Sequence, residues 1–176
     1  MKLHSILVVC ALASALGLQA QIPASHITEG KTFYNLIKKN MSSMADKMAE
    51  ENYSFKPTPD IRTFAQMVAH VADVQAGACS TAAGAPKSIK AASKTTKADL
   101  VAALKESFDM CDAAWDGLTE ATAAEPASFG PFKGSKLFVL EFNTSHTYEE
   151  YGYMSIYLRL KGIVPPSSEP RGGAGR

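Results

Sequence analysis

The most constraining feature of this sequence is a helical spacing of apolar side chains that recurs in four separate segments. Each segment is about twenty residues long, and its apolar residues follow one another at intervals of three and four. This spacing places them on one face of an α-helix, and such a face is buried against another element. The connections are about ten residues long and carry no convincing strand pattern. We therefore predict an all-α fold, a four-helix bundle.

The first helix is predicted over residues 28–49 and the third over residues 97–120. Thr96 and Asp99 resemble a capping box and mark the start of the third helix. The predicted inward faces are Phe33, Ile37, Met41, Met44 and Met48 in the first helix, and Leu100, Val101, Leu104, Phe108, Cys111, Trp115 and Leu118 in the third.

The second and fourth helices carry the polar residues of interest. Thr58 followed by Pro59 is typical of a helix start, so the second helix is predicted over residues 59–83. The fourth is predicted to begin near Ser135 and to end at Gly162, which two prolines follow. The predicted inward faces are Phe64, Met67, Val68, Val71, Val74 and Ala78 in the second helix, and Val139, Phe142, Asn143, His146, Glu150, Tyr153, Tyr157 and Leu160 in the fourth.

The ends of the chain differ from this helical region. Residues 1–20 combine a short charged start, an apolar run and small residues, a pattern typical of a signal peptide. The apolar run is shorter than a membrane-spanning helix requires. We therefore expect an exported protein, periplasmic or secreted, with one domain over residues 21–164 and an extended or disordered tail over residues 165–176. Residues 121–134 are expected to form a loop.

Charge limits the classes of partner. Removal of Lys2 with the signal peptide leaves 17 Lys and Arg against 17 Asp and Glu. A neutral chain without long runs of one sign gives no support for a nucleic-acid partner or for binding of the mature form to a membrane. An unknown small-molecule substrate is expected, and a homodimer stays open. Cys79 and Cys111 remain, and they are either a disulfide or two buried thiols.

Two histidines and one glutamate form a candidate metal site. His26 lies in the entry segment and is expected to be solvated, whereas His70 and His146 lie on or beside apolar helix faces. Glu150 follows His146 by four residues and shares its face. Because burying such groups unpaired is costly, they either hydrogen-bond one another or bind a metal ion.

Two histidines and a glutamate suit a divalent ion with an open fourth position, with zinc as the first expectation and nickel(II) or iron(II) as alternatives. Glu149 is an alternative ligand to Glu150 because it lies three residues from His146. Asp73, Asn143 and the tyrosines are candidates for orienting the ligands. No catalytic base can be named, although Glu149 and Asp73 are candidates.

The chain resembles the DinB/YfiT-like superfamily, particularly its exported bacterial members. The resemblance covers nearly all of the mature chain. Its most specific parts are residues 53–59, 62–64, 70–73, 146–152 and 159–168.

This resemblance implies a four-helix bundle with a metal site of three histidines, one on the second helix and two, four residues apart, on the fourth. His70 and His146 match the first two positions, whereas position 150 is a glutamate. Glutamate can still bind a metal, so the resemblance implies either a retained site with an altered metal preference or a decayed site in a non-catalytic binding or scaffold module. Family members with an assigned activity resemble metal-dependent thiol transferases, hydrolases or isomerases. The expected function is thus a metal-dependent transferase or hydrolase.

Overall fold

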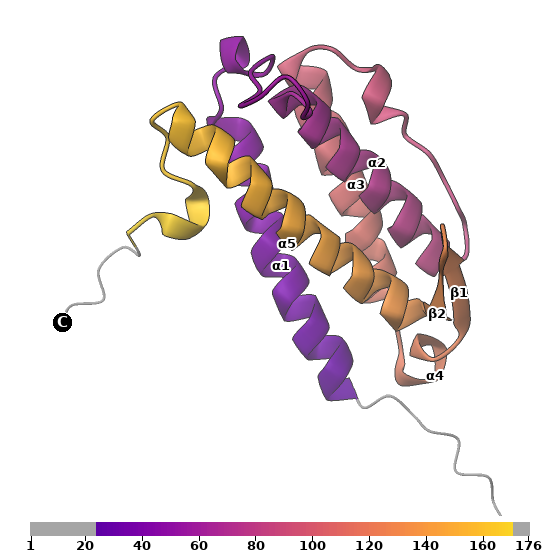
Figure 1. The fold of residues 1–176 in the computed structure, drawn as a ribbon. Helices are drawn as coiled ribbons and strands as arrows, with labels where there is room; N and C mark the ends of the chain where they lie inside the picture. The colour runs from indigo at the N-terminus through magenta and orange to yellow at the C-terminus, as the bar shows by residue number, and fades with distance from the viewer. Residues whose placement is uncertain (1–23, 171–176) are drawn as a thin grey trace, which may run out of the picture.

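The computed structural model describes residues 24–170, so the predicted signal peptide and the last six residues lie outside the described part of the chain. Four long helices form the bundle: α1 (Ala24–Lys47), α2 (Phe64–Ala82), α3 (Lys97–Asp116) and α5 (Lys136–Leu160). In Figure 1, α1 runs beside α5 and α2 runs beside α3. The predicted all-α four-helix bundle is confirmed.

Local capping sets where three of these helices begin. The side chains of Thr96 and Ser135 each accept a hydrogen bond from the backbone N–H three residues on, as expected for N-caps. The predicted start of α2 at Pro59 is wrong, because Thr63 forms the cap. Its hydroxyl accepts from the Gln66 N–H, and the Gln66 side chain accepts from the Thr63 N–H. This reciprocal pair satisfies two otherwise free donors and begins the helix at Phe64.

The core lies between the four helices and is filled by large side chains from each of them. Tyr34, Phe64, Phe108, Trp115 and Met154 are among its fully buried residues. Helix α2 has its largest interface with α3 and its second largest with α5. Its second interface places polar residues of α2 against α5. This packing positions the candidate site.

The predicted helix faces need three corrections. Phe33 is 61% exposed and Tyr34 takes the buried position in α1, where its hydroxyl donates to the Phe108 carbonyl of α3 at 3.0 Å. In α5, Tyr153 and Leu160 lie on the exposed side. Val74 of α2 is only half-buried. The apolar stripes are therefore narrower than the sequence pattern suggested, because the bundle covers only part of each face.

The predicted loop over residues 121–134 contains regular structure instead. A short helix α4 (Glu120–Ala123) is followed by β1 (Pro126–Phe129) and β2 (Phe132–Ser135), which pair as an antiparallel hairpin with Phe129 opposite Phe132. Gly130 has φ +56° in the turn, a conformation that favours glycine. Phe132 packs against Phe142 of α5 with ring centroids 4.2 Å apart. The hairpin thus packs against the beginning of α5.

The chain after α5 packs on the bundle. Gly162 has φ +73° and ends the helix as predicted. Pro166–Ser168 form a 3₁₀ helix rather than an extended tail, and the Ser167 N–H donates to the Tyr151 hydroxyl at 2.8 Å. Lys47 at the end of α1 forms an ion pair with Glu169. Within residues 24–170, no helix has the length and apolar character needed to cross a membrane.

Candidate metal centre

The structure brings His70, His146 and Glu150 together between α2 and α5. His70 lies in the middle of α2, while His146 and Glu150 lie one turn apart on the side of α5 that faces it. The three side chains each point one donor atom at a common position, and these donor atoms lie within 4.8 Å of one another. Their convergence requires the packing of α2 on α5, since the two histidines are 76 residues apart in the sequence.

The donor atoms form a nearly equilateral triangle. His70 Nε2 and His146 Nε2 are 3.3 Å apart, and Glu150 Oε1 lies 3.5 Å from the first and 3.4 Å from the second. A tetrahedral ion with bonds of about 2.0–2.2 Å holds its ligand atoms about 3.3–3.6 Å apart. The triangle therefore has the size of one face of such a coordination shell.

The protonation states of His70 and Glu150 suit metal binding. Burial, followed by the positive charge of Arg62, holds the pKa of His70 below its ordinary value. Burial acts to raise the pKa of Glu150, but the hydrogen bond from His146 and the nearby positive charges outweigh it and lower that pKa. At neutral pH His70 is thus neutral and Glu150 ionised, the forms that bind a cation.

Two atoms of the group have no hydrogen-bond partner. Glu150 Oε2 and His146 Nδ1 are buried and unpaired in the structure. An ionised carboxylate with a buried free oxygen is costly unless a cation or another donor compensates it. The Glu150 side chain is 8% exposed, against 14% for His146 and 28% for His70, so His70 is the edge of the site nearest to solvent. The donor set therefore fits a divalent ion.

The other predicted site residues are occupied elsewhere. Glu149 is exposed and accepts a hydrogen bond from the Tyr153 hydroxyl at 3.0 Å, so it does not replace Glu150. Both Asp73 oxygens accept backbone N–H groups, from Ala91 at 2.7 Å and Ala92 at 3.0 Å. Asp73 therefore fastens the α2–α3 connection and is not available as a base.

The remaining tyrosines do not orient the ligands either. The Tyr157 hydroxyl donates to the Arg62 carbonyl at 2.7 Å, and the Tyr151 hydroxyl accepts from Ser167. His26 is exposed, as expected, although it lies within α1 rather than in an extended entry segment.

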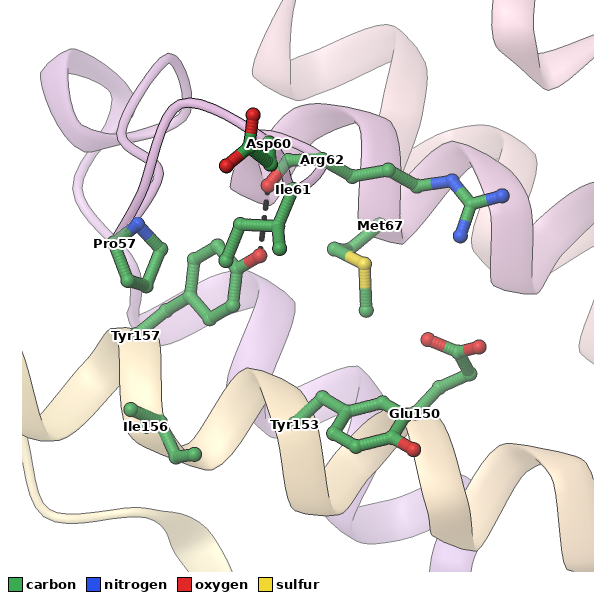
Figure 2. Close-up of a pocket in the computed structure, with 9 residues that line it drawn as sticks. All are labelled: Pro57, Asp60, Ile61, Arg62, Met67, Glu150, Tyr153, Ile156 and Tyr157. Atoms are coloured by element: carbon green, nitrogen blue, oxygen red, sulfur yellow. Dashed lines mark hydrogen bonds between the residues drawn. The ribbon is translucent and has the colours of Figure 1, made fainter.

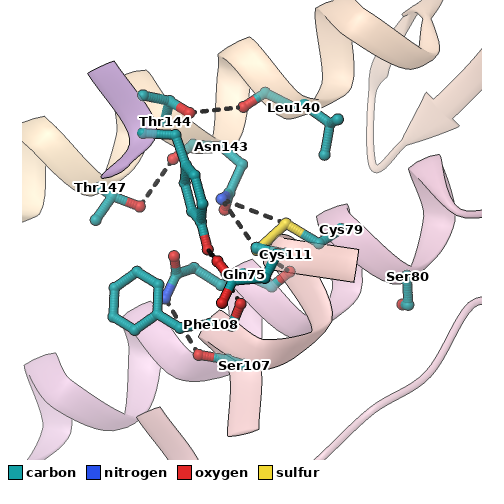
Figure 3. Close-up of a disulfide and its surroundings, with 12 residues drawn as sticks. Gln75, Cys79, Ser80, Ser107, Phe108, Cys111, Leu140, Asn143, Thr144 and Thr147 are labelled. Carbon is teal, nitrogen blue, oxygen red and sulfur yellow. Dashed lines mark hydrogen bonds between the residues drawn. A yellow bond between two sulfur atoms is a disulfide. The ribbon is translucent and has the colours of Figure 1, made fainter. Parts of the chain in front are cut away.

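Asn143 belongs to a disulfide rather than to the metal group. Cys79 of α2 and Cys111 of α3 form this bond, which decides between the two alternatives left by the sequence. Figure 3 shows the Asn143 amide reaching both sulfurs, with Nδ2 at 3.6 Å from each. Beside it, Gln75 Nε2 donates to Ser107 Oγ at 3.1 Å. The disulfide and these polar contacts fix α2 against α3 and α5, about one and a half to two and a half turns from His70.

A cavity of about 580 Å³ opens beside Glu150. Its lining comes from the turn before α2, from α2 and from α5: Pro57, Asp60, Ile61, Arg62, Met67, Glu150, Tyr153, Ile156 and Tyr157. Figure 2 shows the Arg62 side chain extending over the same end of the cavity as Glu150. The sequence patterns gave no role to Arg62, because a residue in an irregular turn has no periodicity; its one signal was its place in the motif over residues 62–64.

Comparison with known proteins gives one family and one fold. A family model described as the DinB superfamily matches residues 36–154. A DinB-like protein from Bacillus cereus has a similar structure, with TM-score 0.67 and 14% identity over 80% of this chain and 93% of that chain. A DinB-like protein from Bacillus subtilis has TM-score 0.64 and 19% identity over 81% and 99% of the two chains.

A mutant of the mycothiol-dependent maleylpyruvate isomerase is also similar, with TM-score 0.61 and 15% identity over 78% of this chain and 67% of that chain. These identities establish a shared fold and nothing finer. No curated protein matches the sequence.

Proposed function

The chain belongs to the DinB superfamily, and from this premise we propose that it binds one divalent metal ion through His70, His146 and Glu150 and uses it in a transferase or hydrolase reaction on a small molecule. The observation that carries the proposal is the triangle of donor atoms with sides of 3.3, 3.4 and 3.5 Å. Its size matches three ligands of a tetrahedral ion, and it leaves a fourth position for a substrate or water.

Three side chains of the protein would hold the ion and leave one coordination position open. His70 and His146 would bind through Nε2 and Glu150 through Oε1, with zinc, nickel(II) and iron(II) all compatible with this donor set. When bound, such an ion supplies Lewis-acid activation of a water, a thiol or a carbonyl group. The cavity beside Glu150 gives a small molecule access to this group. Glu150 also contributes a negative charge that a third histidine would lack.

We further propose that the protein is exported. The signal-peptide pattern of residues 1–20 supports export, and so does the Cys79–Cys111 disulfide, since such bonds persist in oxidising compartments. One protein of similar fold is a mycothiol-dependent maleylpyruvate isomerase, which makes a small thiol one candidate for the fourth position. Export weighs against that candidate, because reduced thiol pools are largely intracellular. A water-activating reaction is therefore the better-supported version.

A second candidate function rests on the same distances. His146 Nε2 and His70 Nε2 are also within hydrogen-bonding range of each other at 3.3 Å, so the three side chains form a self-contained polar network without any ion. In that case the protein is a non-catalytic bundle that binds a partner or ligand. The unpaired buried oxygen of Glu150, Oε2, favours the metal, because a cation beside the carboxylate compensates a buried negative charge that the hydrogen-bonded network alone leaves without a second partner.

Metal content separates the two functions. The mature protein is purified without an affinity tag from its natural compartment, its N-terminus is sequenced, and its metals are measured by inductively coupled plasma mass spectrometry. We expect an N-terminus near residue 21 and about one divalent ion per chain. His70→Ala should lose the ion, Glu150→Gln should lose most of it, and Glu150→His should retain it because histidine is again a ligand.

His26→Ala is the matched control, since it removes an exposed histidine outside the site and should leave the metal content unchanged. No ion in the natural protein, together with no uptake of added zinc, nickel or iron(II), would exclude the metal function and favour the hydrogen-bonded network. An intact N-terminus at Met1 would count against export.

A further inference from the structure

The cavity beside the metal group has two chemically different ends. Arg62 and Glu150 lie at one end in Figure 2, while Pro57, Ile156 and the Tyr157 ring lie at the other. Met67 lies between them. At about 580 Å³ the cavity is within the range of sites that bind small organic molecules. It is thus shaped for a ligand with one polar and one apolar end.

The exposed Arg62 side chain extends over the polar end without a partner of its own. Its backbone carbonyl accepts the Tyr157 hydroxyl at 2.7 Å, which fixes the turn at the cavity rim. Among residues 24–170, however, no hydrogen bond or ion pair is made by its side chain. Arg62 lines this cavity together with Glu150, and it lines a neighbouring cavity together with His70. A free guanidinium therefore lies beside the donor atoms of the metal group.

The charges at this end favour an anion. A divalent ion with Glu150 and Arg62 carries a net charge of about +2 when the histidines are neutral. The other carboxylate of the lining, Asp60, is exposed, and in Figure 2 it points away from both Glu150 and the Tyr157 ring. Asp73 is nearby on α2, but both of its oxygens are engaged by backbone N–H groups. A planar guanidinium pairs with a carboxylate through two parallel hydrogen bonds.

We propose that the cavity binds small monocarboxylates with an apolar body, the carboxylate on Arg62 beside the metal ion and the apolar body against Ile61, Ile156 and the Tyr157 ring. This specificity rests on the proposed metal function, because the ion supplies part of the positive charge. Arg62 acts as the residue that selects for the anion, and the apolar end selects against short carboxylates such as acetate.

Calorimetric titration of the zinc-loaded mature protein tests the proposal, with zinc content measured on the same samples. Three probes separate the two ends: phenylbutanoate, its neutral amide phenylbutanamide, and butanoate, which lacks the aromatic body. We expect phenylbutanoate to bind about tenfold more tightly than either of the others. Arg62→Met should weaken phenylbutanoate about tenfold and leave the amide unchanged.

Lys39→Met is the control, because it removes one exposed cation from α1, away from the cavity, and should bind all three probes as the wild type does. Equal affinity for phenylbutanoate and its amide, or equal affinity of wild type and Arg62→Met for phenylbutanoate, would overturn the carboxylate specificity. Arg62→Met must carry the same zinc content as wild type for this comparison. Loss of zinc from the wild type itself would instead overturn the metal function, and the ligand proposal with it.

Discussion

Tyr34 connects α1 to α3 through a buried hydroxyl. Its one hydroxyl proton is shared between Asp112 Oδ1 at 2.7 Å and the Phe108 carbonyl at 3.0 Å, and Lys38 forms an ion pair with the same carboxylate. Burial, then the hydrogen bond to Asp112, raises the pKa of Tyr34 well above its ordinary value, because the phenolate would be desolvated beside a negative charge. Tyr34 should thus make the free energy of unfolding decrease at high pH.

Tyr34→Phe should lower the free energy of unfolding by about 1–2 kcal/mol at neutral pH, because the hydroxyl's hydrogen bonding to Asp112 and to the Phe108 carbonyl is lost. The pH dependence has a definite sign. Above about pH 10 the tyrosine of the unfolded chain ionises while Tyr34 in the folded chain stays protonated, so the wild type loses stability as pH rises, by about 1.4 kcal/mol per unit from this residue. The variant lacks that loss. Urea unfolding from about pH 8 to about pH 11 should therefore show the gap between the two proteins narrowing. A constant gap would contradict the raised pKa.

Residues of the metal group were predictable to different degrees. The pairing of His146 with Glu150 follows from their four-residue spacing, because it is a property of one helix. The approach of His70 was proposed from its place beside an apolar helix face and was also implied by the family motif, but spacing could not establish it, since it depends on how α2 packs against α5. Asn143 was misplaced because a polar residue on a buried face has several buried groups within reach, and here it contacts the disulfide.

At the scale of elements, a helix end was predictable where the sequence nearby offers a single capping residue. Ser135 and Gly162 each had no rival nearby, and both were correct. The start of α2 was placed after Thr58, whereas the Thr63–Gln66 capping box sets it at Phe64. The hairpin over residues 126–135 was missed because strands of four residues are too short to show a period of two.

The disulfide is the strongest single link between two elements. It joins α2 to α3 across 32 residues of chain, which include the irregular α2–α3 connection. Closing a loop of this length restricts the unfolded chain, an effect of about 3–4 kcal/mol. We therefore expect the double variant Cys79→Ala, Cys111→Ala to unfold in urea with a free energy lower by about this amount, and reduction of the wild type to have a similar effect.

Reductant added to the double variant is the control and should change nothing. Mass spectrometry of the unreduced wild type should show the two cysteines joined. If the bond is present and its reduction leaves the urea midpoint unchanged, the disulfide does not stabilise the α2–α3 pair. Loss of metal from the double variant would show in addition that this pair holds His70 in position.

At the scale of the whole molecule, the candidate site is a product of the fold. Its ligands come from α2 and α5, which are separated in the sequence by α3 and the hairpin and come together only in the folded chain. An unfolded chain presents His70 and His146 76 residues apart and cannot offer the same donor triangle. A metal ion that binds these residues therefore binds the folded chain far more tightly than the unfolded one.

Metal should accordingly stabilise the entire bundle in a concentration-dependent way. At free zinc of about a hundred times the dissociation constant, linkage adds about 2.7 kcal/mol to the free energy of unfolding, which corresponds to a rise in Tm of about 5–10 °C for a chain of this size. Differential scanning calorimetry over a range of free zinc measures the rise. His70→Ala should unfold at a temperature independent of zinc, whereas His26→Ala should follow the wild type. If the wild-type Tm does not change with zinc, or if it rises equally in His70→Ala, no ion is shared between α2 and α5. Only an ion bound to both helices in the folded chain makes the stability of the bundle depend on His70.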